Sequence, residues 1–334
     1  MSILVVGGAG YIGSHAVYTL IEKKEKVVVV DSLATGDAEA VHPKAVFYQG
    51  DIRDRHFLKQ VFANEAIETV MHFAAAPISS QPESVFASFN ENITGMETLL
   101  GVMKEFGVSQ IVFASSASVY GQAKDIPITE ETEPRPVDPH GKAKWMMENM
   151  LMEAEKAYGL KYVILRSFNV GGILLAEAGE DRDSEQHFIS HVLRAALGQK
   201  PFVSLSCSNH AAAEGTYIRD YVHVQDLAEA HALAVSHLRK GKESRTYNIG
   251  YGEGYSAEQV IQAAQYVTGI SMINTRYTER SGTAPDTLIA SSVRARKELG
   301  WKPKHNSLIA IIRDAWNWNS DNLYGYGAYK VKQG

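Results

Sequence analysis

The chain has little cysteine and no excess of positive charge. Cys207 is its one cysteine in 334 residues, which excludes an internal disulfide and is typical of proteins of the reducing cytoplasm. Its 33 lysines and arginines are outnumbered by 38 aspartates and glutamates, for a formal net charge of −5. Because nucleic-acid binding depends on a basic surface, we expect no nucleic-acid partner.

Long apolar segments are missing as well. No run reaches the length of about 20 apolar residues that crosses a bilayer, and a strand pattern starts at Ile3 without a signal-peptide pattern before it. There is no Pro/Gly/Ser-rich linker and no internal repeat. Hydrophobic residues make up 45% of the chain, enough for a large core in one large or two modest domains. We expect a cytoplasmic protein without a membrane partner.

The N-terminal segment has the pattern of a dinucleotide site. An apolar run at 3–6 leads into GGAGYIGSH at 7–15, and apolar residues then recur at helical spacing. A strand, a glycine turn and a helix allow a pyrophosphate to approach the backbone N–H groups at the helix N-terminus. A second apolar strand ends at Asp31, about 20 residues beyond the glycines. Its carboxylate can accept hydrogen bonds from ribose hydroxyls and repels a 2′-phosphate, which favours NAD over NADP.

Strand and helix patterns alternate through the first half of the chain. Apolar strand patterns at 45–49, 69–73 and 110–114 are separated by helical stretches. This alternation predicts an α/β fold with a Rossmann-type doubly wound parallel sheet, whose ligands lie beyond the carboxyl ends of the strands. Asp51 and Ser116 follow two of these strands. His72 also ends an apolar strand, and we interpret it as a packed core histidine.

The second half predicts a smaller α/β unit. Strands are expected at 221–224 and 247–249, and helices at 226–238, 256–268 and 307–317. We expect a Rossmann domain at 1–168, with chain crossings from about 215–250. A smaller C-terminal α/β substrate lobe would consist mainly of 169–334.

Several short motifs follow one another in a fixed order. They are GGAGYIGSH (7–15), Asp31, GDIRD (50–54), HFAA (72–75), SSASVYG (115–121), Lys144, RSFN (166–169), RDYVHV (219–224), NIG (248–250) and LGW (299–301). From Met1 to about Tyr324 the chain resembles the extended short-chain dehydrogenase/reductase family, and within it most of all the UDP-glucose 4-epimerase branch. The resemblance implies an enzyme that interconverts the C4 epimers of a UDP-hexose by passing a hydride to bound NAD and back.

The same resemblance implies which residues form the site. For the cofactor it implies Gly7, Gly10, Tyr11, Ile12, Gly13, Asp31, Asp51, Ile52, Phe73, Ala74, Ala75, Asn92, Ser115, Lys144 and Phe168. For the UDP-sugar it implies Ser116, Asn169, His187, Arg219 and Arg280, with the two arginines on the diphosphate, since a guanidinium forks onto phosphate oxygens. The alternative for Arg219 is a salt bridge to Asp220 or Asp226.

The catalytic group departs from the family pattern. His140 stands four residues before Lys144, where the resemblance implies a tyrosine, so the implied catalytic set is Ser116, His140 and Lys144. A neutral imidazole is a competent base near pH 7, and Lys144 would lower its pKa further. However, the ring ends roughly 2 Å short of a phenol oxygen, and a misplacement of about 1 Å can cost on the order of a hundredfold in rate. We expect reduced or altered activity. The alternative is a pseudoenzyme that holds NAD and a nucleotide sugar without turnover.

Further departures gather at the nicotinamide and sugar end. They are Pro77, Glu91, Ser167, His187 and Thr283, whereas the adenosine end matches the family. Sugar dehydratases of the same superfamily carry an Asp-Glu pair where this chain has Ala117 and Ser118, so the residues offer no acid to expel water. His187 and His191 have helical spacing but lack a glutamate and a third ligand, and we expect no metal.

The resemblance also implies a homodimer formed through two helices of each subunit. These helices are expected at 84–105 and 142–157. Their apolar candidates are Trp145, Met146, Met147, Met150 and Met152. A methionine stripe of this kind is also common in an ordinary core.

Overall fold

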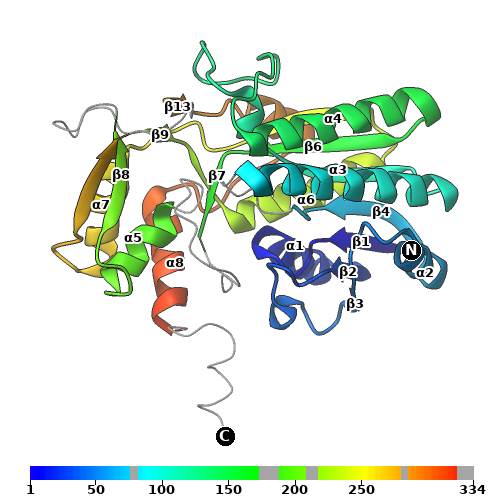
Figure 1. Cartoon of the computed structure of the whole chain (residues 1–334), viewed down its shortest axis with the longest axis horizontal. Helices are drawn as coiled ribbons and strands as arrows, with labels where there is room; N and C mark the ends of the chain where they lie inside the picture. Colours follow the sequence, from blue (N-terminus) through cyan, green and yellow to red (C-terminus); the bar gives the residue numbers. More distant parts are fainter. Residues whose placement is uncertain (76–81, 173–187, 208–216, 280–284, 322–334) are drawn as a thin grey trace, which may run out of the picture.

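A parallel seven-stranded sheet forms the centre of the molecule (Figure 1). The computed structural model describes residues 1–75, 82–172, 188–207, 217–279 and 285–321. In spatial order the strands are β11 (Arg245–Ile249), β6 (Lys161–Ser167), β5 (Gln110–Ser116), β4 (Ile67–His72), β1 (Ser2–Val6), β2 (Val27–Asp31) and β3 (Val46–Gln49). The strand order reverses beside β1, which has β2 on one side and β4 on the other. The predicted Rossmann-type fold is therefore confirmed.

Helices cover both faces of this sheet. On one face lie α1 (Tyr11–Glu22) and α6 (Val224–Arg239), and on the other lie α2 (Arg55–Asn64), α3 (Pro82–Glu105) and α4 (Pro139–Tyr158) (Figure 1). Strand β1 shows the division, because Ile3 and Val5 pack into the first core and Leu4 and Val6 into the second. Burial on both faces explains why these strands are apolar at every position. No described helix is long and apolar enough to cross a membrane.

A smaller lobe packs around its own core beside the sheet (Figure 1). It contains α5 (Phe188–Ala196), α7 (Ala257–Thr268) and α8 (Leu308–Asp321), with β8 (Val203–Cys207) paired to β12 (Thr275–Glu279). Short parallel pairs connect the lobe to the sheet: β7 (Asn169–Gly171) with β10 (Tyr221–His223), and β9 (Ile218–Arg219) with β13 (Thr287–Leu288). Short helical turns lie at Ala38–Ala40, Ala117–Tyr120 and Ala295–Leu299.

Two boundaries of the second half were predicted wrongly. Strand β10 ends at His223, one residue earlier than expected, and α6 begins at Val224, two residues earlier than expected. The cause is the cap, because the ring Nδ1 of His223 accepts a hydrogen bond from the backbone N–H of Gln225 at 3.1 Å, and histidine is not a usual capping residue. Met147 was one of the apolar candidates for the dimer interface. It is 1% exposed and packs in the core beneath α4, as in the alternative of an ordinary core.

Candidate active site

The main cavity opens beyond the carboxyl ends of β1 and β4, where the strand order reverses. Its volume is about 540 Å³, within the range of about 300–1,000 Å³ that small-molecule sites occupy. All residues predicted for the cofactor line it, as do Ser116, His140 and Asn169 of the catalytic and substrate sets. The structure therefore gathers residues from seven separate sequence motifs around one cavity.

The glycine turn after β1 leaves no room for side chains. Gly7 has a φ of +78°, and a Cβ there would lie 2.4 Å from the backbone N of Ala74. A Cβ on Gly13 would lie 2.1 Å from the carbonyl oxygen of Gly7. Helix α1 can therefore approach β1 only because Gly13 has no side chain, which is the packing that brings a helix N-terminus to a pyrophosphate.

Gly13→Ala is expected to lower the free energy of unfolding by at least about 2 kcal/mol and to remove bound dinucleotide, because the added methyl displaces α1 from the turn. Urea unfolding and the nucleotide released on denaturation measure both effects. Gly10→Ala is the matched control for stability, since a Cβ there meets its nearest atom at an ordinary 3.5 Å. A Gly13→Ala protein with wild-type stability and wild-type nucleotide content would contradict this account of the turn.

At the adenosine end, Asp31 is held by the backbone of the glycine turn. Its two carboxylate oxygens accept hydrogen bonds from the N–H groups of Ala9 and Leu33, each at 2.9 Å. Each oxygen keeps a free lone pair with which to accept a ribose hydroxyl. Asp51 pairs with Arg53 at 2.5 Å, and that guanidinium lowers the pKa of the carboxyl group. Arg53 also contacts Glu91 at 3.2 Å, so this departure from the family pattern serves as an ion-pair partner at the cavity wall.

Helix α4 carries two of the predicted catalytic residues. Its N-terminus is set by Asp138, whose carboxylate accepts the N–H of Gly141 at 2.8 Å, and by Pro139 in the first turn. Lys144 is 6% exposed, and its ammonium group donates to the carbonyl of Ala114 at 2.8 Å. Burial lowers the pKa of Lys144 to about 8, and Glu148 acts in the opposite direction. The lysine therefore remains mostly protonated at pH 7.

His140 lies one turn before Lys144 and lines the same cavity. Burial first, and then the charge of Lys144, lower its pKa to about 3. The pKa shift has the direction expected from the charge of Lys144, and it leaves the imidazole neutral at pH 7. A base with so low a pKa is present in the right form at pH 7 but has little driving force to take up a proton.

Ser116 is the last residue of β5 and lines the same cavity. Its hydroxyl donates to the Ser118 hydroxyl at 3.1 Å and accepts the N–H of Ser118 at 3.2 Å. Phe168 and Asn169 follow β6, where their backbone N–H groups donate to the carbonyls of Ile249 and Asp220, each at 3.0 Å. These bonds fix the junction between the sheet and the smaller lobe. A hydroxyl donor and a neutral imidazole thus face the cavity near a buried ammonium group.

Arg219 has a different setting from the one expected. It is 5% exposed, and its guanidinium donates to the carbonyls of Pro285 at 2.9 Å and Asp286 at 3.2 Å. It does not line the main cavity. Among the described residues no ion pair joins Arg219 to Asp220 or Asp226, whose carboxylates accept hydrogen bonds from N–H and hydroxyl groups of other residues. His187, Arg280, Pro77 and Thr283 lie outside the described residues.

His72 was interpreted as a core residue, and the structure adds a second property. It is 1% exposed, as expected, and packs edge-on against Phe113 at 5.6 Å between ring centroids. It also lines the cavity, and neither ring nitrogen has a hydrogen-bond partner in the described protein. Burial and the charge of Lys144 lower its pKa to about 3. Its position directly after an apolar strand was the available signal.

A cluster missed in the sequence joins His223, His305 and Asp314. The two rings stack at 4.3 Å, and Nε2 of His223 lies 3.2 Å from a carboxylate oxygen of Asp314. The groups are close enough to hold a metal ion. However, Nδ1 of His223 accepts the N–H of Gln225, so the proton of the neutral ring belongs on Nε2, facing Asp314. A metal there would leave the ring without a proton on either nitrogen, and the contact is better explained as a His–Asp pair.

Comparison with known proteins places this geometry in a family. Residues 3–250 match the model of the NAD dependent epimerase/dehydratase family. The chain is 47% identical over 330 residues to UDP-glucose 4-epimerase of Streptococcus mutans serotype c, covering 98% of this chain and 99% of that one. It is 46% identical over 332 residues to the UDP-glucose 4-epimerase of Lacticaseibacillus casei, with the same coverage of the two chains.

Solved structures of similar proteins have the same fold over the full length. A crystal structure of a UDP-glucose 4-epimerase superposes with a TM-score of 0.90 at 42% identity, covering 98% of this chain and 99% of that chain. The UDP-glucose 4-epimerase of Bifidobacterium longum, in complex with NAD+ and UDP, superposes with a TM-score of 0.88 at 31% identity, covering 98% of this chain and 100% of that chain.

Proposed function

The chain belongs to the NAD dependent epimerase/dehydratase family, and we propose that it is an NAD-dependent UDP-hexose 4-epimerase in which His140 has the place of the family's tyrosine. The observation that carries the proposal is the convergence of Ser116, His140 and Lys144 on the cavity that the glycine turn opens. Similarity to UDP-glucose 4-epimerases over nearly the whole chain supports the substrate class. NAD is the cofactor that the Asp31 carboxylate favours.

The residues divide the chemistry between them. Bound NAD supplies the hydride acceptor and donor for C4 of the sugar. Lys144 would hold the nicotinamide ribose by hydrogen bonds, and its charge would stabilise negative charge that develops on the 4-oxygen. Ser116 would donate to that oxygen. His140 would remove the hydroxyl proton through a bridging water, because its ring is shorter than a tyrosine side chain, and would return the proton at the end of the reaction.

The 169–334 lobe binds the nucleotide half of the substrate in this proposal. Asn169 lies at the cavity, while Arg219, with His187 and Arg280, would act on the UDP. Arg219→Ala is expected to weaken UDP binding at least tenfold, because it removes a charge-assisted donor or releases the Pro285–Asp286 carbonyls that it holds. Calorimetric titration with UDP measures the change, and Arg245→Ala on the exposed sheet edge is the control. Equal affinity in the wild type and Arg219→Ala would place the diphosphate elsewhere.

Product analysis tests the activity. The purified protein is incubated with UDP-galactose, and UDP-glucose is separated and quantified, while denaturation of a second sample releases the bound nucleotide. We expect NAD in the second sample and UDP-glucose in the first. NADP, or no dinucleotide at any protein concentration, would contradict the assignment of the cofactor.

One observation favours a second candidate function. A histidine with a pKa of about 3 and a short reach is a poor proton carrier, which suits a protein that binds NAD and a nucleotide sugar without converting it. Bound NAD and UDP, together with no conversion of UDP-galactose by the wild type or by His140→Tyr, would support that pseudoenzyme. Conversion by the wild type would support the epimerase.

We also propose a homodimer in the cytoplasm. Helices α3 and α4 lie side by side on one face of the sheet (Figure 1), and Phe86 and Met146 on them are 82% and 47% exposed. Two large apolar side chains on adjacent helices suit a helical interface with a second copy. The single Cys207 suits a reducing compartment. Light scattering of the wild type and of Phe86→Glu tests the assembly.

A further inference from the structure

A buried ion pair lies behind the catalytic residues. Glu148 on α4 is wholly buried, and Arg166 on β6 is 3% exposed. Two nitrogens of the Arg166 guanidinium donate to the two Glu148 oxygens, at 2.6 and 3.1 Å. The hydroxyl of Ser115 donates to the same carboxylate at 2.5 Å. Burying an unpaired charge is energetically costly. The Glu148 carboxylate and the Arg166 guanidinium are therefore held in this paired geometry.

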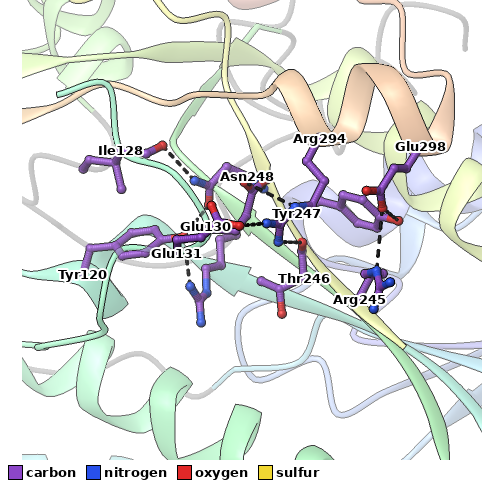
Figure 2. A network of polar contacts seen from close by, with 11 residues as sticks. Tyr120, Ile128, Glu130, Glu131, Arg245, Thr246, Tyr247, Asn248, Arg294 and Glu298 are labelled. Atoms are coloured by element: carbon purple, nitrogen blue, oxygen red, sulfur yellow. Dashed lines mark hydrogen bonds and ion pairs between the residues drawn. The ribbon is translucent and has the colours of Figure 1, made fainter. Parts of the chain in front are cut away.

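The pair is the centre of a longer network. Arg166 donates to the Tyr120 hydroxyl at 2.9 Å, and that hydroxyl donates to the side-chain oxygen of Asn248 at 2.7 Å. In Figure 2 Ile128 lies above Tyr120, both to the left of Asn248, whose amide donates to the Ile128 carbonyl at 3.0 Å. The chain of contacts therefore connects α4, β6, the turn after β5 and β11. Ser115 is the member of this network that lines the cavity, and Glu148, Arg166, Tyr120 and Asn248 are not among the lining residues, so they act on the site through their neighbours.

Glu148 and Lys144 attach α4 to successive residues of β5. Lys144 donates to the carbonyl of Ala114, and Ser115, the next residue, donates to Glu148. Ser116 follows directly. Since Lys144 and Glu148 are four residues apart, they lie on the same face of the helix, one turn from each other. Two fixed points in a row determine both how far α4 extends along β5 and how it is rotated about its axis.

Several titratable groups surround Lys144. They are Glu148 and His140 on α4, His72 on β4 and His231 on α6. The three histidines have pKa values lowered to about 3 or 4 by burial, so they are neutral above pH 6. Glu148 raises the pKa of Lys144 and so opposes the effect of burial. It is thus the group that keeps the ammonium charged in this setting.

We propose that Glu148 is a positioning residue for the reaction: it fixes α4 against β5 so that Lys144 and Ser116 face the same point, and it supplies the negative charge behind the Lys144 ammonium. This inference rests on the proposed function, in which that ammonium holds the nicotinamide ribose. Arg166 is then the counterion that makes a buried Glu148 tolerable.

The test follows cofactor binding against pH. The holoprotein is equilibrated with NADH from pH 6 to pH 10, and the emission of bound NADH gives the fraction bound. In the wild type, binding should weaken as Lys144 loses its proton near pH 8. Removing the opposite charge in Glu148→Gln should move this midpoint down by about one pH unit. Lys144→Met should abolish the midpoint, which assigns it to the lysine.

Two further variants separate the charge from a general loss of structure. Glu148→Gln leaves Arg166 buried without its partner and can fail to fold, whereas Glu148→Met with Arg166→Met replaces the pair by apolar residues of similar size. A folded double variant should show a midpoint that is lowered less than in Glu148→Gln, because it removes the guanidinium charge together with the carboxylate, and Glu148→Asp should keep the wild-type midpoint. A wild-type midpoint in the folded double variant would overturn the proposal. NADH binding with these shifts but without epimerisation would refute the proposed reaction and leave the role of Glu148 standing.

Discussion

Replacing His140 by tyrosine is expected to raise the rate of UDP-hexose epimerisation at least tenfold, which corresponds to about 1.4 kcal/mol off the barrier. The substitution lies in the first turn of α4, where Asp138 and Pro139 set the helix geometry independently of residue 140. A phenol is longer than an imidazole, so we expect its oxygen to reach further into the cavity that Ser116 also lines. Lys144, one turn along, would lower the pKa of that phenol and stabilise the phenolate.

The rate is measured as conversion of UDP-galactose to UDP-glucose at equal NAD content. His140→Phe is the matched control, because it has the size of tyrosine without the hydroxyl, and it should be less active than the wild type. If His140→Tyr gains nothing while NAD and UDP still bind, then Glu91 and Ser167 have changed the pocket for another substrate or for binding alone. The pseudoenzyme would then be the better account.

The pH dependence of the wild type follows from the position of His140. An ordinary histidine would become protonated, and its activity as a base would fall, near pH 6.5. Because the pKa of His140 is about 3, the imidazole stays neutral throughout the range from pH 8 to pH 5. A loss of activity in that range therefore has another cause than the titration of this residue.

The sheet and the cofactor half of the cavity could be predicted because their signals are local. A strand buried on both faces is apolar at every position, as in Val27–Val30, and a glycine turn with Asp31 at the next strand's end has a fixed spacing. The edge at which these motifs meet follows from parallel topology. The identity of one residue, His140, could also be read directly from the chain.

The remaining features depend on contacts between distant segments. In the sequence Glu148 looks like an exposed helix residue. Arg166 is 18 residues further along the chain and contacts Glu148 only because β6 packs next to α4. The cap of α6 by His223 was missed for a related reason, since the ring must leave the solvent before it can act as the acceptor. Met147 shows what a run of methionines in the sequence cannot predict. The pattern does not indicate which side chains pack into the core of the subunit and which face another molecule.

Acidification from pH 7 to pH 5.5 is expected to lower the free energy of unfolding, by about 3 kcal/mol through His15, His72 and His231 alone. His15, His72 and His231 are each at most 3% exposed, and burial lowers their pKa values to about 4, 3 and 4. Below pH 6.5 these histidines therefore bind protons in the unfolded chain but stay neutral in the folded protein. The free energy of unfolding falls as the pH falls. Asp220 acts in the opposite direction, because burial raises its pKa to about 6 and the folded protein gains its proton first.

Urea unfolding at pH 7, 6.5 and 5.5 measures how the free energy of unfolding depends on pH. The contribution of one histidine can be tested by substitution. His72 has no hydrogen-bond partner among the described atoms, so His72→Leu loses no hydrogen bond, and it should remove about 1 kcal/mol of the pH effect. His56→Leu on the exposed face of α2 is the matched control and should leave the slope as it is. His72 also lines the cavity, near Lys144. If the free energy of unfolding does not depend on pH, water reaches this part of the site. The low-dielectric environment inferred for His140 would then be contradicted as well.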